Sequence, residues 1–150
     1  MPSESIQSLR PSPAPAVLVG TILMTAGYLL PWFRRSDSYE WSYSGWSYAT
    51  LSNGGGWTNI TFVFLLVSFV AAVWAGRSHA AAMWAVTAVV GAGSLALCVV
   101  AASFSNIPDR GYTNYLTDLP FGVGIPLLAA GFGLATASGV VALARTRQES

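Results

Sequence analysis

Few side chains in this sequence could act as an acid, a base, a nucleophile or a metal ligand. There is one histidine, His79, and one cysteine, Cys98. A metal site needs several such ligands close together, and the sequence contains neither an HExxH pattern nor a Cys/His cluster. A haem held by two histidines would need a second histidine. The sequence therefore predicts no cofactor and no metal site.

Acid–base catalysis would have to draw on carboxylates from two polar segments of the chain. A pair of carboxylates can act as a general acid and a general base when a fold brings them together. Exposed loop charges are usually only solvated, so we expect a protein that is not an enzyme. The carboxylates concerned are Asp37, Glu40, Asp109 and Asp118.

The polar segments separate four apolar stretches that contain no Asp, Glu, Lys, Arg or His. Their ranges are 16–33, 57–75, 80–104 and 121–144. A bilayer core of about 30 Å is crossed by roughly 20 apolar helical residues. Charged residues make up only 9% of the chain, against about 25% in soluble domains. We therefore predict an all-α membrane protein, an antiparallel bundle of four transmembrane helices.

The segments outside these helices define the expected topology. We expect a tail over 1–15, outer loops over 34–56 and 105–120, and a tail over 145–150. The tails and the short turn after the second helix carry Arg10, Arg77, Arg145 and Arg147, and the longer loops carry Arg34, Arg35 and Arg110. This bias predicts cytoplasmic termini and extracytoplasmic loops in the inner (plasma) membrane.

Residues 39–50 alternate aromatic side chains with small or polar ones, which is the period of a β-strand. Ser44 and Gly45 can form a two-residue turn between two such strands. We therefore predict a short extracytoplasmic β-hairpin with its aromatic residues on one face. These residues are Tyr39, Trp41, Tyr43, Trp46 and Tyr48.

The aromatic face has two interpretations. It could rest on the outer end of the bundle, or it could bind a partner protein, a lipid headgroup or a sugar, since Tyr and Trp are frequent anchors of interfaces. Trp57 at the start of the second helix, and Tyr112 and Tyr115 in the second loop, complete the candidate binding residues.

Two further features concern the helix ends. Tryptophan favours the headgroup level of a membrane, and we expect this placement for Trp32, Trp57, Trp74 and Trp84. Pro126 lies inside the fourth stretch, where the loss of its backbone donor is expected to bend the helix.

Small residues predict where the helices pack, because helices in lipid associate through close backbone approach. One face of the fourth helix carries Gly124, Gly131, Ala135 and Ser138, and the third helix carries Ala88, Ala92 and Ala96. These faces could close an intramolecular bundle or dock a partner helix.

Three short motifs give the first half a recognisable plan. Leu29-Leu30-Pro31-Trp32 ends the first helix, Tyr43-Ser44-Gly45-Trp46 follows, and a glycine-rich run leads into Trp57. This plan resembles small uncharacterised four-helix membrane proteins of actinobacteria, which implies a fold and a lineage but no activity. At the level of the plan it is also similar to the claudin-like tetraspan proteins. The Gly-Leu-Trp sequence and the paired loop cysteines of that family are absent, so its function is not implied.

These patterns predict a non-catalytic accessory or structural subunit of a larger cell-envelope membrane complex. Its partners would be membrane lipids and another membrane protein, or further copies of itself. The net charge of +1 gives no electrostatic footprint for nucleic acid. One alternative is a module that binds a lipid or a glycan at the outer face. Another is a homo-oligomeric pore or carrier lined by Thr21, Thr25, Ser68, Thr87, Ser94 and Thr136, although such side chains more often bond their own helix.

Overall fold

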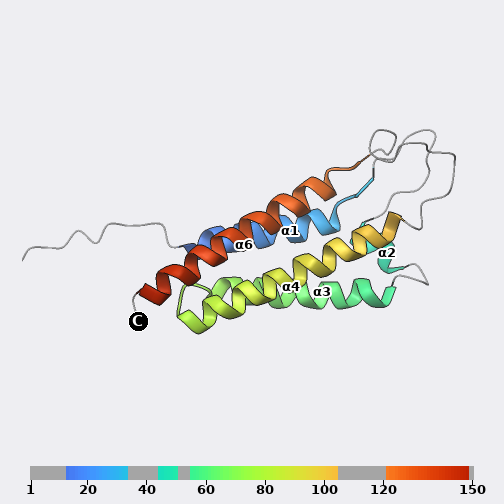
Figure 1. Ribbon diagram of the computed structural model, residues 1–150. Coiled ribbons are helices and arrows are strands. Elements are labelled where there is room, and N and C mark those ends of the chain that lie inside the picture. The colour runs from blue at the N-terminus through green and yellow to red at the C-terminus, as the bar shows by residue number, and fades with distance from the viewer. Residues whose placement is uncertain (1–12, 34–43, 51–54, 105–120, 149–150) are drawn as a thin grey trace, which may run out of the picture.

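The computed structural model describes residues 13–33, 44–50, 55–104 and 121–148. Its helices are α1 (Pro13–Leu29), α2 (Gly45–Ala49), α3 (Gly55–Trp74), α4 (His79–Ser103) and α6 (Gly124–Gln148). The four long helices form one elongated bundle, with the start of α1 and the end of α6 at the end where α3 turns into α4 (Figure 1). Each long helix packs against two neighbours, in the order α1, α6, α4, α3 and back to α1.

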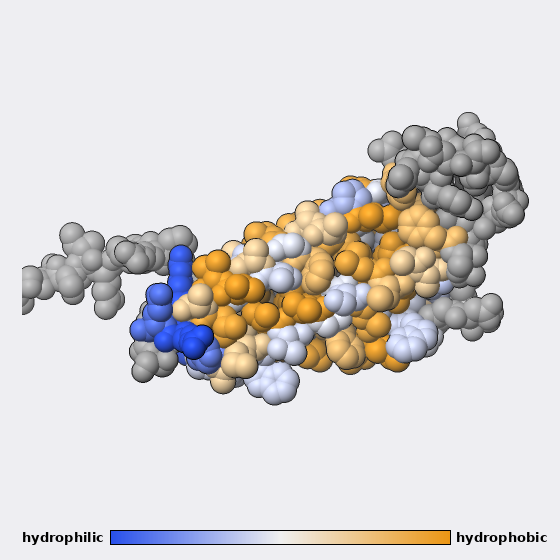
Figure 2. Space-filling view, viewed as in Figure 1, coloured by the Kyte–Doolittle hydropathy of each residue, from blue (hydrophilic) through white to orange (hydrophobic). Residues whose placement is uncertain are grey.

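Three of the helices are long and apolar enough to cross a membrane. The candidate spans are Gly56–Trp74, His79–Ser103 and Gly124–Gln148. A shorter apolar helix covers Pro15–Leu29. Hydrophobic residues cover the side of the bundle seen in Figure 2. The described chain is therefore helical and has the length and composition expected of a multi-pass membrane protein.

The backbones of α1 and α6 approach so closely that side chains would not fit between them. A Cβ atom on Gly27 would lie 2.7 Å from the Leu128 Cα and 2.8 Å from the Gly124 carbonyl oxygen. A Cβ on Gly131 would lie 2.7 Å from the Gly20 carbonyl oxygen. Close approach through small residues is the usual way in which helices associate in lipid. The α1–α6 seam consists of Gly20, Gly27, Gly124, Gly131 and Ala135.

The same seam contains most of the small residues of α6 that were candidates for packing. Ala92 and Ala96 of α4 are also buried, and both belong to the hydrophobic core of the bundle. Ser138 and Ala88 are half-buried. In the described part of the chain, the small-residue faces of α4 and α6 therefore contact other helices of the same molecule.

A short stretch of paired backbone joins the end of α1 to the start of α6. Phe33 and Phe121 form an isolated antiparallel bridge. The Gly122 N–H donates to the Trp32 carbonyl at 2.7 Å, and the Gly124 N–H donates to the Pro31 carbonyl at 3.0 Å. The first N–H groups of a helix have no partner within it, so this pairing satisfies one of them for α6.

Pro126 does not act as the expected interior kink. The helix α6 begins at Gly124, so the proline lies in its first turn. A first-turn N–H has no carbonyl to bond within the helix, and the absence of that N–H removes no helical hydrogen bond there.

The predicted β-hairpin is wrong over the half that the structure describes, because Gly45–Ala49 form the helix α2. Ser44 and Ser47 build a capping box, in which the Ser44 N–H donates to the Ser47 Oγ at 2.7 Å and the Ser47 N–H donates to the Ser44 Oγ at 3.3 Å. These local hydrogen bonds compete with strand pairing. Trp46 and Tyr48 consequently do not share a face, being 71% and 4% exposed.

The tryptophans divide into two groups. Trp57, Trp74 and Trp84 are exposed at 65%, 51% and 72%, as expected of indoles at the surface near helix ends. Trp32 is fully buried, so its predicted position among lipid headgroups is wrong. The chain after Leu29 leaves the helix and turns this indole inward against α2.

Candidate functional site

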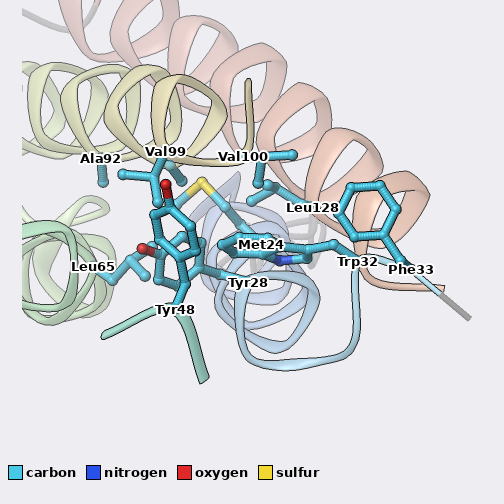
Figure 3. Packing of buried hydrophobic residues seen from close by; sticks show 11 residues of the cluster. Met24, Tyr28, Trp32, Phe33, Tyr48, Leu65, Ala92, Val99, Val100 and Leu128 are labelled. Carbon is cyan, nitrogen blue, oxygen red and sulfur yellow. The ribbon is translucent and has the colours of Figure 1, made fainter. Parts of the chain in front are cut away.

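Aromatic side chains from α1, α2 and α3 meet at one end of the bundle. The Trp32 ring lies 5.5 Å from the Tyr28 ring and 6.0 Å from the Tyr48 ring, between centroids, and Figure 3 shows these three side chains together. Tyr28 also meets Phe62 of α3 edge-on at 5.5 Å. Such pairs contribute about 0.5–1.5 kcal/mol each beyond their burial. We call Tyr28, Trp32, Tyr48 and Phe62 the aromatic cluster.

The helix α2 can reach this cluster because it begins with glycine. A Cβ atom on Gly45 would lie 2.6 Å from the Tyr28 Cδ1 and 2.8 Å from the Tyr28 carbonyl oxygen. Only a residue without a side chain can approach so closely. The capping box then fixes the start of α2, and one turn of helix directs Tyr48 inward and Trp46 outward.

Two polar groups in the aromatic cluster have no hydrogen-bond partner among the described residues, namely the Tyr28 hydroxyl and the Trp32 Nε1–H. Thr58 and Thr61 of α3 lie close to the Tyr28 hydroxyl. The Thr61 hydroxyl donates to the Trp57 carbonyl at 2.8 Å. A buried donor left without a partner costs about 1–3 kcal/mol, and in this cluster the cost applies most clearly to the Trp32 Nε1–H, because two threonine hydroxyls lie beside Tyr28.

An apolar groove of about 380 Å³ runs between α1 and α3. Its polar lining is confined to a small part of its surface, and α1 and α3 are the neighbouring long helices with the least extensive contact. We call it the α1–α3 groove. It is lined by Ile22, Thr25, Ala26, Leu29, Phe62, Leu65, Leu66 and Phe69.

The α1–α3 groove and the aromatic cluster share Phe62. Trp46 of α2 meets Phe62 edge-on at 6.1 Å and remains 71% exposed. An exposed indole therefore lies next to a side chain that lines the groove. A molecule in this part of the groove would contact Phe62, and the Trp46 ring lies next to that contact.

The sequence-predicted binding residues do not form a single described surface. Trp46 and Trp57 are exposed, and Tyr48 is buried in the aromatic cluster. The remaining candidates, Tyr39, Trp41, Tyr43, Tyr112 and Tyr115, lie outside the described residues.

Four residues of the aromatic cluster and its surroundings were not singled out by the sequence analysis: Tyr28, Phe62, Thr58 and Thr61. Tyr28 precedes Trp32 by four residues, which is a helical spacing, but Trp32 follows the end of α1 at Leu29, so this spacing does not explain their contact. Thr58, Thr61, Leu65 and Ser68 recur at intervals of three and four, and all are buried. This helical period is the sequence pattern that could have identified the inner face of α3.

Three of the six polar side chains considered for a pore bond their own helices, whereas the Thr136 hydroxyl is buried without a hydrogen-bond partner among the described residues. Thr21 donates to the Val17 carbonyl at 2.8 Å, and Thr25 donates to the Thr21 carbonyl at 2.9 Å. Ser68 donates to the Leu65 carbonyl at 2.8 Å. Such back-bonding leaves these hydroxyls less able to line a polar path.

The opposite end of the bundle is basic. His79 Nδ1 lies 3.1 Å from Thr146 Oγ1 and joins the start of α4 to the end of α6. The Arg77 guanidinium lies over the Trp74 ring, 4.2 Å from its centroid. We call Arg77, His79, Arg145 and Arg147 the basic end. Figure 2 shows hydrophilic residues gathered there.

Within the described ranges, no three His, Cys, Asp or Glu residues lie close enough together to hold a metal ion. No protein-family model, no curated protein and no solved structure matches this chain. The resemblance to four-helix actinobacterial membrane proteins therefore stays a prediction.

Proposed function

We propose that this chain is a four-span membrane protein that serves as a non-catalytic accessory subunit of a larger cell-envelope complex. The α1–α3 groove would receive a transmembrane helix of the partner protein. The observation that carries the proposal is the unequal packing of α1, which is in backbone contact with α6 and leaves an open groove towards α3.

The first helix is the shortest of the four, and we propose that it spans the membrane together with residues 30–33. Seventeen helical residues rise about 25 Å at 1.5 Å each. The apolar residues 30–33 continue in the same direction, and the carbonyls of Pro31 and Trp32 accept hydrogen bonds from the start of α6. Non-helical backbone within a membrane needs such internal partners. Helix and extension together match a core of about 30 Å.

The groove has the features that a docked helix would use. Its floor includes the small side chain of Ala26, while Leu66 and Phe69 on its rim are 65% and 40% exposed. Small residues permit close approach of a second helix, and packing is the main attraction between helices in lipid. The small-residue faces of α4 and α6 are already occupied within the molecule, so the groove is the docking surface that we favour.

Filling the groove tests the proposal. Ala26→Phe places a large side chain in it, and Ala130→Phe adds the same bulk at an exposed position of α6. After purification in a mild detergent at native expression, we expect the wild type and Ala130→Phe to retain a stoichiometric partner and Ala26→Phe to lose it. Equal recovery from all three proteins, or a clean monomer from the wild type, would contradict the proposal.

A second candidate function is a module that binds a lipid or a glycan at the outer face. Two highly exposed indoles, Trp46 and Trp57, favour it, because such side chains stack on sugars and insert between headgroups. Trp46→Ala should then weaken binding in a lipid and glycan array without changing the far-ultraviolet circular dichroism spectrum. Unchanged binding would exclude this role for Trp46.

We propose cytoplasmic termini for the same molecule, with residues 34–56 and 105–120 outside. Single cysteines at Ser3 and Ser47 test this orientation in a Cys98→Ala background. An impermeant maleimide added to intact cells should label Ser47→Cys and spare Ser3→Cys. The reverse pattern would invert the orientation and leave the docking proposal intact.

A further inference from the structure

The basic end combines charge with exposure. Arg77, Arg145 and Arg147 are the only formally charged residues within the described ranges, and all three are exposed. Exposed guanidinium groups attract anions.

One contact between helices joins the chain segments that carry these arginines. Thr146 lies between Arg145 and Arg147, and its hydroxyl lies 3.1 Å from His79 Nδ1. The same hydroxyl donates to the Ala142 and Leu143 carbonyls at 3.1 Å.

His79 is the first residue of α4 and follows Arg77 by two positions. The hydrogen bond to Thr146 therefore brings the turn that contains Arg77 next to the last turn of α6. Arg77, just before α4, and Arg145, in the last turn of α6, therefore belong to chain segments that are in contact.

The indoles beside the basic end indicate its depth in a bilayer. Trp74 and Trp84 are 51% and 72% exposed, and the Trp74 ring carries the Arg77 guanidinium. Exposed indoles prefer the boundary between hydrocarbon and headgroups. A guanidinium stacked on such a ring lies at the level of lipid phosphates.

We propose that the basic end binds the headgroup phosphate of an anionic phospholipid, with Arg77 and Arg145 as its anion ligands. The planar guanidinium donates two parallel hydrogen bonds to a phosphate. An anionic headgroup leaves the phosphate charge uncompensated, whereas the cationic amine of a zwitterionic lipid would be repelled by the neighbouring arginine.

A phospholipid fits this surface better than a free phosphate does. Three exposed apolar side chains lie about one turn from the basic end. Met83 and Trp84 of α4 are 50% and 72% exposed, and Val141 of α6 is 45% exposed. One lipid can place its phosphate on the arginines and its acyl chains on these apolar side chains. The proposal needs the bundle to be inserted in a bilayer, but it does not depend on the partner subunit proposed above.

The test compares lipid retention by the full chain. The protein is purified in detergent with equal amounts of phosphatidylglycerol and phosphatidylcholine, and the bound lipids are measured by native mass spectrometry. The variant Arg77→Gln/Arg145→Gln removes the proposed ligands. The control Arg34→Gln/Arg35→Gln makes the same change in net charge at residues outside the described ranges.

We expect the wild type and the control to retain phosphatidylglycerol preferentially. A basic residue near an anionic surface contributes roughly fivefold in affinity, so the preference of the Arg77→Gln/Arg145→Gln variant should fall by more than tenfold on the same basis. Retention of both lipids in equal amounts by the wild type would overturn the proposal, as would an unchanged preference in the variant.

Two further measurements separate this site from general charge and from misfolding. Displacement of the lipid by inorganic phosphate as readily as by added phosphatidylglycerol would show a site for free anions and contradict the proposal. Arg77→Lys/Arg145→Lys keeps the charge but lacks the planar fork. If the glutamine variant does not fold, loss of the preference in this lysine variant supports the arginine ligands, and a full wild-type preference contradicts them.

Discussion

The Tyr28 side chain shows how a membrane protein can use a tyrosine mainly for its ring. The ring contacts Trp32 and Phe62, and the glycine at the start of α2 packs on its edge. The hydroxyl makes no hydrogen bond of good geometry with the described residues, although Thr58 and Thr61 lie beside it. Ring and hydroxyl therefore contribute with opposite sign to the free energy of unfolding.

Removing this hydroxyl should leave stability unchanged or increase it. In Tyr28→Phe the ring contacts remain and an unsatisfied buried donor, costing about 1–3 kcal/mol, is lost. Tyr28→Ala should instead destabilise by about 3–5 kcal/mol, as for other large-to-small changes of buried aromatic residues. Thermal unfolding in nanodiscs measures both effects. A lower melting temperature for Tyr28→Phe would show that Thr58, Thr61 or a bridging water bonds the hydroxyl after all.

The tryptophans at helix ends show what sequence position can and cannot predict for single residues. Tryptophans at helix ends commonly lie among headgroups, and Trp57, Trp74 and Trp84 are indeed exposed. The burial of Trp32 depends on the chain leaving the helix after Leu29 and on the contact with Tyr48 of α2, which comes later in the sequence. No local pattern contains that information.

At the scale of the element, the α1–α6 seam depends on glycines that have no substitute. A methyl group on Gly131 would come within 2.7 Å of the Gly20 carbonyl oxygen, whereas one on Gly133 would meet nothing within 4 Å. The two positions lie on the same helix, two residues apart, and differ only in what they face. They form a matched pair.

Alanine at these two positions should have opposite effects. Gly133→Ala should stabilise α6 by up to about 1 kcal/mol, because alanine favours a helix more than glycine does. Gly131→Ala should destabilise the bundle by about 1–3 kcal/mol, the usual cost of overpacking. Unfolding by sodium dodecyl sulfate, followed by circular dichroism, compares the two. Equal stability of the variants would mean that the backbones are not in contact at Gly131.

The elements were predictable to different degrees. Apolar length alone located the long helices to within a few residues, since lipid leaves little choice of structure for such segments. The strand period of residues 39–50 was misleading over its described half. There, two serines three residues apart cap a short helix, and hydrogen bonds between near neighbours outweighed the alternation of aromatic side chains.

At the scale of the whole molecule, polarity is arranged along the bundle axis. One end has the aromatic cluster and the exposed Trp46, the other has the arginines, and apolar side chains cover the surface between them. The order of the helices around the axis, and therefore the position of the α1–α3 groove, follows from which small residues meet. The small residues of α6 were predictable from their spacing, but their contact with α1 was not, because the spacing on one helix does not identify its neighbour.

The single cysteine provides a test of insertion for the molecule as a whole. Cys98 is exposed on the surface of α4, so in water a maleimide would reach it readily. In a bilayer the same thiol faces hydrocarbon, which an impermeant charged maleimide does not enter. We therefore expect an impermeant maleimide to spare Cys98 in open membrane sheets and to label it after denaturation.

A cysteine at the exposed turn before α4 provides the control. In the same sheets the maleimide should rapidly label Ser78→Cys in a Cys98→Ala background. Equally rapid labelling at both positions would place the α4 surface in water and contradict the membrane-spanning arrangement.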